Sequence, residues 1–420
     1  MDYKRIEKEK YCLHFMKTDK FKTVLMRVNF KQTITKKLIT ENEILAGLLS
    51  NSSYELKTLK DMILKKEDLY QLGYDCSTVT SGNYIIFKSF VKFINEKYTE
   101  KGMNEASIKF FLDSVFKPNI DDNGFKKDIF DLEKNNYMEY LEGKDDNPSR
   151  YANQKFNEIL GEGTPLEFDH SGDAKVLEDI DEKSIYKSYL NMLNNSSVDI
   201  FFVGDMELDD VTKIIDSYFV NVKKNKLDGE HYVSLPINEL KEVKEKSNFT
   251  QGKLRMGFTI TDLTDFERQY VLPIYNFILG GDADSLLFKN VREKNSLCYD
   301  VYSNFITVYS ALRVVADISS KDYEKAVSII KEMIEYMKNG EFDEEEMDKV
   351  KLNYKTSFRE ITDSNQSISN ILESREYLNY DLPNERIEKI DSVTKDMVIS
   401  LANRVNLKVI YFLEGNDGTC

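Results

Sequence analysis

Arg292 and Tyr299 are the two polar side chains of this sequence whose types and spacing best suit chemistry. They lie in the segment 279–303, LGGDADSLLFKNVREKNSLCYDVYS. A guanidinium donates hydrogen bonds in a fixed fork and a phenol offers one O–H, so the pair provides donors for a carbonyl or anionic oxygen. The plainer alternative is a surface arginine beside Glu293 and a half-buried tyrosine on a strand.

The pattern around the two residues predicts the elements that position them. The glycine pair 280–281 permits a backbone turn that residues with side chains resist. Apolar residues then follow at helical spacing over 285–292, and the period changes to strict alternation over 297–302. We therefore expect a turn, an amphipathic helix and a strand, with the side chain of Cys298 facing away from that of Tyr299.

This segment resembles the Arg/Tyr motif in the C-terminal half-domain of the pitrilysin/insulinase metallopeptidases, the inverzincins. In that family a Gly-Gly-Ser-type turn leads to SxLFxxxREKxxLxYxVYS, and the match here runs from Ser285 through Phe288 to Ser303. The resemblance implies that Arg292 and Tyr299 reach the substrate near a zinc ion. There they would help to hold the peptide or its developing oxyanion.

The zinc motif of the same family is missing from the sequence. An inverzincin H-x-x-E-H places two imidazoles on one helical face, with a glutamate beside them as general base. In the corresponding segment 41–53, ENEILAGLLSNSS, the His, Glu and His places are occupied by Glu43, Ala46 and Gly47. We therefore interpret this segment as a degenerate zinc-site helix.

The other metal-ligating and nucleophilic side chains are scattered along the sequence. They are His14, His170, His231, Cys12, Cys76, Cys298 and Cys420. A catalytic zinc takes three protein ligands plus water, and no such set comes from nearby positions, so we expect no metal in this chain. Without C-x-x-C spacing the cysteines are expected to be reduced, and Cys298 lacks a well-placed histidine to act as its base.

A repeat of about 210 residues indicates two related half-domains. Each half opens with a strand pattern, over 21–30 and over 253–260, and a helical stretch follows. Each half also ends with a helix pattern and a strand pattern, over 198–204 and over 409–415. We predict an α+β fold of two half-domains, each a mostly antiparallel sheet with helices on one face. The pitrilysin-like proteins have the same duplicated arrangement.

The charge pattern suggests where the half-domains meet. Residues 223–248 are polar and rich in charge, without sustained apolar periodicity, and we read them as a linker. Residues 1–222 then form the N-terminal half-domain with the degenerate zinc-site helix. Residues 249–420 form the C-terminal half-domain with the Arg/Tyr motif.

Composition excludes several classes of function. A formal net charge of -15, with 25 tyrosines and 25 phenylalanines, argues against nucleic-acid binding, which requires basic faces. The longest apolar stretch, 270–279, is about half the length of a membrane span. Residues 1–23 lack the apolar core of a secretory signal. We expect a cytoplasmic protein that binds neither nucleic acid nor membranes.

An intact Arg/Tyr segment without a zinc motif is similar to one subunit of the bacterial heterodimeric members of this family. In such pairs one subunit carries H-x-x-E-H and the other contributes the arginine and the tyrosine. The resemblance implies a paralogous zinc-binding partner, no cofactor in this chain and no autonomous activity. The pair would cleave a short or unfolded peptide, which Arg292 and Tyr299 hold opposite the zinc of the partner.

A second hypothesis is a structural or peptide-binding protein of the same fold with no role in proteolysis. The non-proteolytic core proteins of respiratory complexes are examples of this kind. Retention of both Arg292 and Tyr299 at the family spacing favours the subunit hypothesis. A third possibility, a zinc peptidase active by itself, would require a wholly different metal site.

Overall fold

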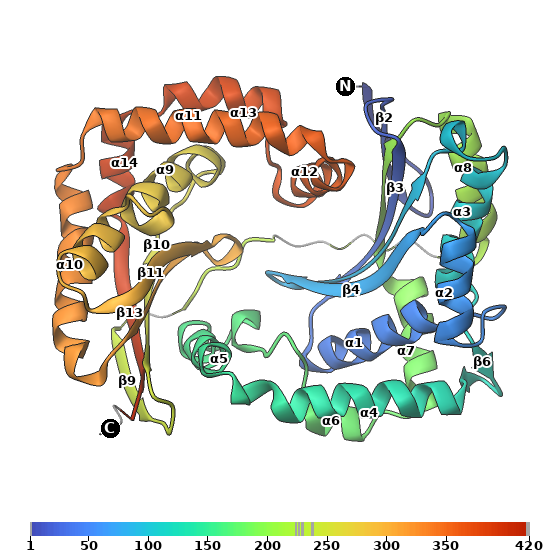
Figure 1. Ribbon diagram of the computed structural model, residues 1–420, viewed down its shortest axis with the longest axis horizontal. Helices are drawn as coiled ribbons and strands as arrows, with labels where there is room; N and C mark the ends of the chain where they lie inside the picture. The colour runs from blue at the N-terminus through green and yellow to red at the C-terminus, as the bar shows by residue number, and fades with distance from the viewer. Residues whose placement is uncertain (1, 223–224, 226, 228–230, 237–238, 417–420) are drawn as a thin grey trace. The chain divides into compact units, whose positions relative to one another are not determined.

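The computed structural model describes the chain except for residues 1, 223–224, 226, 228–230, 237–238 and 417–420 (Figure 1). The chain divides into two compact units, and neither is continuous in sequence. Unit 1 consists of 1–143, 169–230 and 362–377, and unit 2 consists of 144–168, 231–361 and 378–420.

Unit 1 is built on a six-stranded sheet in the order β1-β2-β8-β3-β5-β4. All its neighbouring strands are antiparallel except β2 and β8, which are parallel. The strands are β1 (Asp2–Glu7), β2 (Cys12–Lys17), β3 (Thr23–Thr33), β4 (Gly73–Ser81), β5 (Tyr84–Ile94) and β8 (Ser197–Gly204), with a separate hairpin of β6 (Ile120–Asp121) and β7 (Gly124–Phe125).

Alternation along the strands separates the two faces of this sheet. Leu13, Phe15 and Phe30 point into an apolar core that also contains the inner sides of the helices, whereas His14 and Arg27 face the other way. The core-side helices are α1 (Lys36–Asn51), α2 (Leu59–Asp68), α3 (Met103–Phe116), α4 (Lys127–Gly143), α6 (Ala174–Glu178), α7 (Glu182–Asn195) and α8 (Leu208–Tyr218). The opposite, polar face is contacted by α12 (Asn365–Leu378).

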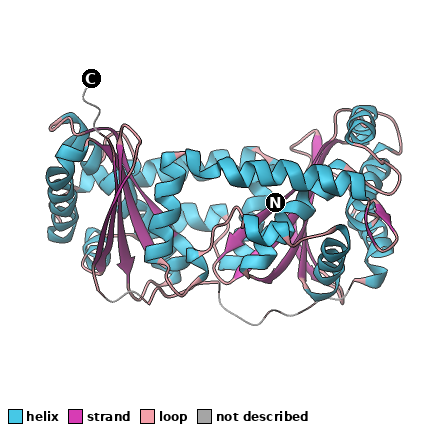
Figure 2. Ribbon diagram, turned by 90° about the horizontal axis from the view of Figure 1, so that it is seen from below, coloured by secondary structure: helices cyan, strands magenta, loops and turns pink. Residues whose placement is uncertain are grey.

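Unit 2 is built on a five-stranded sheet in the order β11-β12-β10-β13-β9. Only the β13–β9 pair is parallel. The strands are β9 (Lys241–Lys246), β10 (Gly252–Ile260), β11 (Cys298–Ile306), β12 (Ala311–Ile318) and β13 (Val405–Glu414). The helices are α5 (Pro148–Leu160), α9 (Leu272–Asn276), α10 (Tyr323–Asn339), α11 (Glu344–Glu360), α13 (Pro383–Lys389) and α14 (Lys395–Ala402). Figure 2 shows the helices of each unit beside its strands.

The two sheets repeat one topology. The order β2-β8-β3-β5-β4 in unit 1 corresponds to β9-β13-β10-β12-β11 in unit 2, and the parallel pair lies at the same place in both. The predicted fold of two related α+β half-domains is therefore confirmed. Each sheet also carries one helix on its second face, α12 in unit 1 and α5 in unit 2.

The structure differs from the expected domain limits in two ways. Residues 241–246, within the range read as a linker, form β9, an edge strand whose exposed lysines and glutamates show no apolar alternation. The helices α5 and α12 also each belong to the unit that does not contain their sequence neighbours α4 and α11. Both differences depend on contacts that are distant in sequence.

Candidate functional site

The structure brings Arg292 and Tyr299 into contact. Arg292 lies in the helical turn η7 (Phe288–Glu293), and Tyr299 lies at the start of β11, an edge strand of the unit 2 sheet. The guanidinium carbon of Arg292 is 5.0 Å from the centroid of the Tyr299 ring and 4.5 Å from that of Phe288. These distances are within the range of cation–π attraction, so the two rings hold the guanidinium in place.

A β-bulge decides the direction of Tyr299. Cys298 pairs with Ile318 and Val301 pairs with Ala316, so β11 has one residue more than β12 over this stretch. The expectation that Tyr299 shares a face with its apolar neighbours is therefore wrong. Leu297 and Val301 are buried, whereas the side chain of Tyr299 is 79% exposed. The bulge turns the phenol out of the core and leaves it accessible to a ligand.

Arg292 and Cys298 both lie next to Tyr299, but only the arginine is suited to interact with a ligand. Within the described part of the chain, the guanidinium of Arg292 makes ring contacts but no ion pair, so its donors are available to a ligand. Burial raises the pKa of the neighbouring Cys298 thiol to about 11. A thiol with such a pKa is protonated at neutral pH and is a poor nucleophile, which argues against catalysis by Cys298.

The glycine pair before this segment acts through close packing. Gly280 has a φ of -162°, an extended value that any residue can adopt, so the expected need for an unusual turn is wrong at this position. A Cβ atom on Gly280 would instead lie 2.6 Å from Ser303 Oγ and 2.8 Å from the Ser303 backbone nitrogen. Gly280 therefore lets β11 approach the end of the preceding helical turn.

The degenerate zinc-motif positions lie on helix α1, which begins after the N-cap residue Thr35. Glu43, Ala46 and Gly47 occupy one face of the helix, since residues three and four apart are neighbours there. The carboxylate of Glu43 accepts a hydrogen bond from the Thr78 hydroxyl of β4, and burial raises the pKa of Glu43. Ala46 is buried in the apolar core of unit 1.

Glu133 of α4 is a residue that sequence reasoning missed at this face. A Cβ atom on Gly47 would lie 2.7 Å from Glu133 Oε2, so the glutamate fills the space that a side chain at position 47 would take. Its other carboxylate oxygen accepts a hydrogen bond of 2.8 Å from Asn51 Nδ2. No sequence pattern connects α1 with α4, and only the fold reveals this contact. The zinc motif requires His, Glu and His at positions 43, 46 and 47. Glu43, Ala46 and Gly47 provide neither the two imidazole ligands nor the general base of a catalytic zinc site.

The histidines and cysteines are less scattered in space than in sequence. His14 and Cys12 lie beside Asp199 and Glu376 in unit 1, whereas His170 contacts the Thr80 hydroxyl at 2.9 Å. The signal for the first pair was the C-x-H spacing, which places both side chains on one face of a strand. Burial raises the pKa of Cys12 to about 12.

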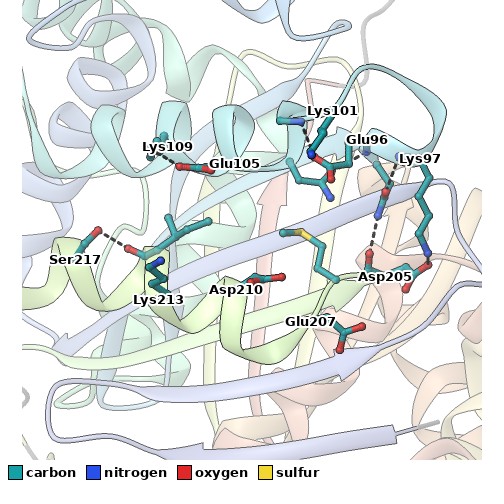
Figure 3. Close-up of a pocket in the computed structure, with 15 residues that line it drawn as sticks. Glu96, Lys97, Lys101, Glu105, Lys109, Asp205, Glu207, Asp210, Lys213 and Ser217 are labelled. Atoms are coloured by element: carbon teal, nitrogen blue, oxygen red, sulfur yellow. Dashed lines mark hydrogen bonds and ion pairs between the residues drawn. The ribbon is translucent and has the colours of Figure 1, made fainter.

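A surface hollow of about 600 Å³ in unit 1 lies between α3 and α8 (Figure 3). Its lining contains lysines and acids in similar numbers, and several of them pair with one another, as Lys97 does with Asp205 and Lys109 with Glu105. None of the residues singled out in the sequence lines this hollow. Paired surface charges of this kind are no indication of chemistry.

The chain is similar in sequence to a family of known proteins. A family model described as the Peptidase M16 inactive domain matches residues 179–354. A probable inactive metalloprotease, YmfF of Bacillus subtilis, is 27% identical over 409 residues, which are 96% of each chain. None of the described helices has the length and apolar character needed to cross a membrane.

Two solved structures share the fold over the whole chain. A conserved protein from Enterococcus faecalis V583 has a TM-score of 0.92 at 23% identity and covers 100% of both chains. A peptidase M16 inactive domain from Pseudomonas fluorescens has a TM-score of 0.81 at 18% identity and covers 99% of both. At these identities the structures establish the fold alone.

Proposed function

Because this chain is an M16-like protein of the inactive type, we propose that it is a substrate-binding subunit rather than a peptidase in its own right. Its partner would be a paralogous subunit that carries the intact zinc motif, and the pair would cleave short or unfolded peptides. The observation that carries this proposal is the contact between Arg292 and an exposed Tyr299.

The two side chains are suited to hold a peptide carbonyl. The guanidinium of Arg292 contacts the rings of Phe288 and Tyr299, and no ion pair among the described residues involves it, so its N–H donors are available to a ligand. The hydroxyl of Tyr299 adds one further donor close by. Donors that are oriented in advance stabilise a developing negative charge on oxygen better than mobile ones do.

The edge position of β11 supports binding of an extended peptide. Among the described strands, β11 is the outermost on its side of the unit 2 sheet, so one row of its backbone N–H and C=O groups pairs with none of them. An added peptide strand can pair with such an edge through main-chain hydrogen bonds. The peptide would then run directly past Tyr299 and Arg292.

The proposal can be tested with the purified chain, the paralogue that carries H-x-x-E-H, and a fluorogenic peptide. We expect cleavage to require both chains, and Arg292→Ala to lower kcat/KM on the order of 10²-fold. Tyr299→Phe keeps the ring that contacts Arg292 and removes only the hydroxyl, so a loss of rate with this variant assigns a role to the O–H.

The matched control is Lys294→Ala, which removes an exposed cation from the same segment and should leave the rate unchanged. If the paralogue cleaves equally well alone, or if both Arg292→Ala and Tyr299→Phe retain full activity, the subunit proposal is wrong. The structural or peptide-binding alternative would then be favoured. Peptide binding without any effect on cleavage would identify that alternative directly.

A further inference from the structure

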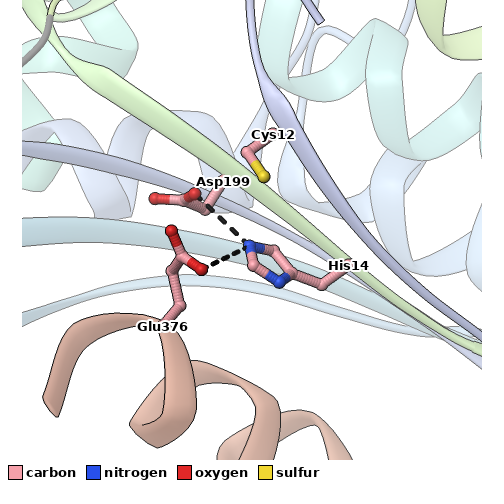
Figure 4. A group of neighbouring side chains, drawn as sticks. All are labelled: Cys12, His14, Asp199 and Glu376. Carbon is pink, nitrogen blue, oxygen red and sulfur yellow. Dashed lines mark hydrogen bonds and ion pairs between the residues drawn. The ribbon is translucent and has the colours of Figure 1, made fainter. Parts of the chain in front are cut away.

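Four potential metal ligands meet on the polar face of the unit 1 sheet. They are Cys12 and His14 of β2, Asp199 of β8 and Glu376 of α12, and their ligand atoms all lie within 4.8 Å of one another (Figure 4). Cys12 and His14 are two residues apart and so share one face of β2. Asp199 is the direct register partner of Cys12 on the parallel strand β8. Glu376 reaches the group from the helix that packs on this face.

From this arrangement we propose that Cys12, His14, Asp199 and Glu376 form a binding site for a divalent ion of the zinc type. Imidazole, thiolate and carboxylate are the side chains that bind Zn²⁺ in proteins. The site is separate from α1 and is formed entirely by residues of unit 1.

The distances between the ligand atoms are close to those of a tetrahedral zinc site, although some are longer. His14 Nε2 lies 3.5 Å from Asp199 Oδ1 and 3.8 Å from Glu376 Oε2. Ligand atoms around a tetrahedral zinc with ordinary bond lengths are roughly 3.3–3.8 Å apart. Because no two ligand atoms are more than 4.8 Å apart, the group has to contract by no more than about 1 Å, which rotation of a side chain can supply.

A second layer of contacts orients three of the four ligands. The Tyr3 hydroxyl lies 3.0 Å from His14 Nδ1, so the opposite ring nitrogen, Nε2, faces the carboxylates. The Tyr377 hydroxyl donates to Asp199 Oδ2 at 3.1 Å. Arg5 donates two hydrogen bonds to Glu376, of 2.9 and 2.8 Å. Metal-binding histidines and carboxylates are commonly held by outer partners of this kind.

A simple ion-pair network explains less of the arrangement. An imidazolium between two carboxylates would account for His14, Asp199 and Glu376, but not for the thiol of Cys12 within the same small sphere. Binding of the ion would release the proton of the buried Cys12 thiol to solvent. The resulting thiolate and the two carboxylates around a divalent ion carry one net negative charge, and the Arg5 guanidinium at Glu376 compensates for it. The Cys12 and His14 side chains are almost fully buried, which excludes competing water.

Four protein ligands leave no open coordination position, so the ion would be structural and would take no part in hydrolysis. It would link β2 and β8 to α12, a helix more than 150 residues away in the sequence from either strand. We expect bound zinc to raise the thermal stability of the chain, since an ion that binds only the folded state stabilises it.

Cobalt(II) titration of the metal-free full-length chain tests the site. We expect one equivalent to bind with the visible bands of a tetrahedral ion and with a thiolate-to-cobalt charge-transfer band in the near ultraviolet. Cys12→Ser should abolish that charge-transfer band. The matched control is the variant with Cys76→Ser, Cys298→Ser and Cys420→Ser, which keeps Cys12 as its only cysteine and should retain the band.

Two results would overturn the proposal. One is a wild-type chain that gives no thiolate band, and the other is a band that persists in Cys12→Ser. If Cys12→Ser does not fold, the variant that keeps Cys12 as its only cysteine still tests the proposal. Absence of the thiolate-to-cobalt band in that folded variant would exclude Cys12 as a ligand. Glu376→Gln should weaken zinc binding at least 10-fold in competition with a chromogenic chelator, and unchanged affinity would contradict the fourth ligand. These readings need no partner chain and are independent of peptide cleavage.

Discussion

One inserted residue determines what Tyr299 can do. On a regular strand it would point into the core between Leu297 and Val301, and its hydroxyl would be buried. The bulge at the start of β11 exposes it beside Arg292 instead. Bulges often redirect side chains next to functional sites, so the distorted strand supports the substrate-binding role proposed for this pair.

Gly280→Ala should destabilise the protein. The added Cβ would lie within 2.8 Å of the Ser303 backbone nitrogen, which cannot move without shifting β11. We expect a loss of roughly 1–3 kcal/mol in the free energy of unfolding, measured by urea denaturation. Gly143→Ala is the control, since nothing lies within 4 Å of a Cβ there. Equal stability of the two variants would show that β11 does not pack closely on Gly280.

Glu43→Gln should stabilise the chain in a pH-dependent way. Burial raises the folded-state pKa of Glu43 above its ordinary value of 4.5, so folding favours the protonated acid. The stability of the wild-type chain then falls as the pH rises from about 4.5 through the raised pKa, and Gln removes this loss.

We expect the melting temperature of Glu43→Gln to exceed that of the wild type by about 1–3 °C at neutral pH and by less at pH 4.5, in thermal scans. Glu67→Gln changes an exposed glutamate of the same unit and serves as the control. A difference that does not change with pH would contradict the assigned cause.

At the scale of elements, α12 is held to its sheet by buried ionic contacts. Glu373 accepts from Arg27 Nη1 at 2.8 Å and from Asn29 Nδ2 at 3.2 Å, and it also pairs with Lys88. The Arg27 side chain is only 5% exposed. These ionic contacts are made by charged and polar side chains, which hydrophobic periodicity alone does not locate.

Glu373→Ala should therefore loosen α12. Removing one partner of a buried ion pair leaves Arg27 uncompensated, and we expect a cost of roughly 3–5 kcal/mol in the free energy of unfolding. Urea denaturation measures the loss, and hydrogen exchange should show faster exchange in 365–378. Glu142→Ala, at an exposed position on α4, should cost far less. Equal losses would show that α12 is not held by these ion pairs.

At the scale of the whole molecule, each unit contains one helical segment whose neighbours in the sequence belong to the other unit. Residues 144–168 follow α4 in the chain but pack on the unit 2 sheet, where Phe156 and Leu160 contribute to an apolar cluster. Residues 362–377 follow α11 but belong to unit 1. Neither unit therefore has all of its parts within one continuous half of the sequence.

A fragment of residues 1–230 should be unstable on its own. It lacks α12, which leaves Arg27 without Glu373 and Asp199 without Tyr377, and it carries α5 without the sheet that covers Phe156. We expect low solubility or a non-cooperative thermal transition, followed by circular dichroism, and recovery on co-expression with residues 231–420. A soluble fragment that unfolds cooperatively at the temperature of the full chain would contradict this exchange of segments.

The sequence by itself determined the features that depend on local pattern. The opening and closing strands of each half and the repeat follow from periodicity and residue types over short stretches. The Arg/Tyr motif was found by its resemblance to a known family, and the loss of the zinc motif can be read at Glu43, Ala46 and Gly47. The predicted α+β half-domains agree with the structure because both halves bury apolar faces of ordinary spacing.

Only the tertiary structure decided the features that depend on distant pairing. The pairing of β9 with β13, the approach of Glu133 to Gly47 and the meeting of Cys12 with Glu376 join segments far apart in the chain, and the bulge that exposes Tyr299 depends on the register between β11 and β12. Each of these contacts includes polar or charged residues, so no apolar period marks it in the sequence. These residues come together because of the register of the sheets and because α5 and α12 each pack in the unit that does not contain their sequence neighbours.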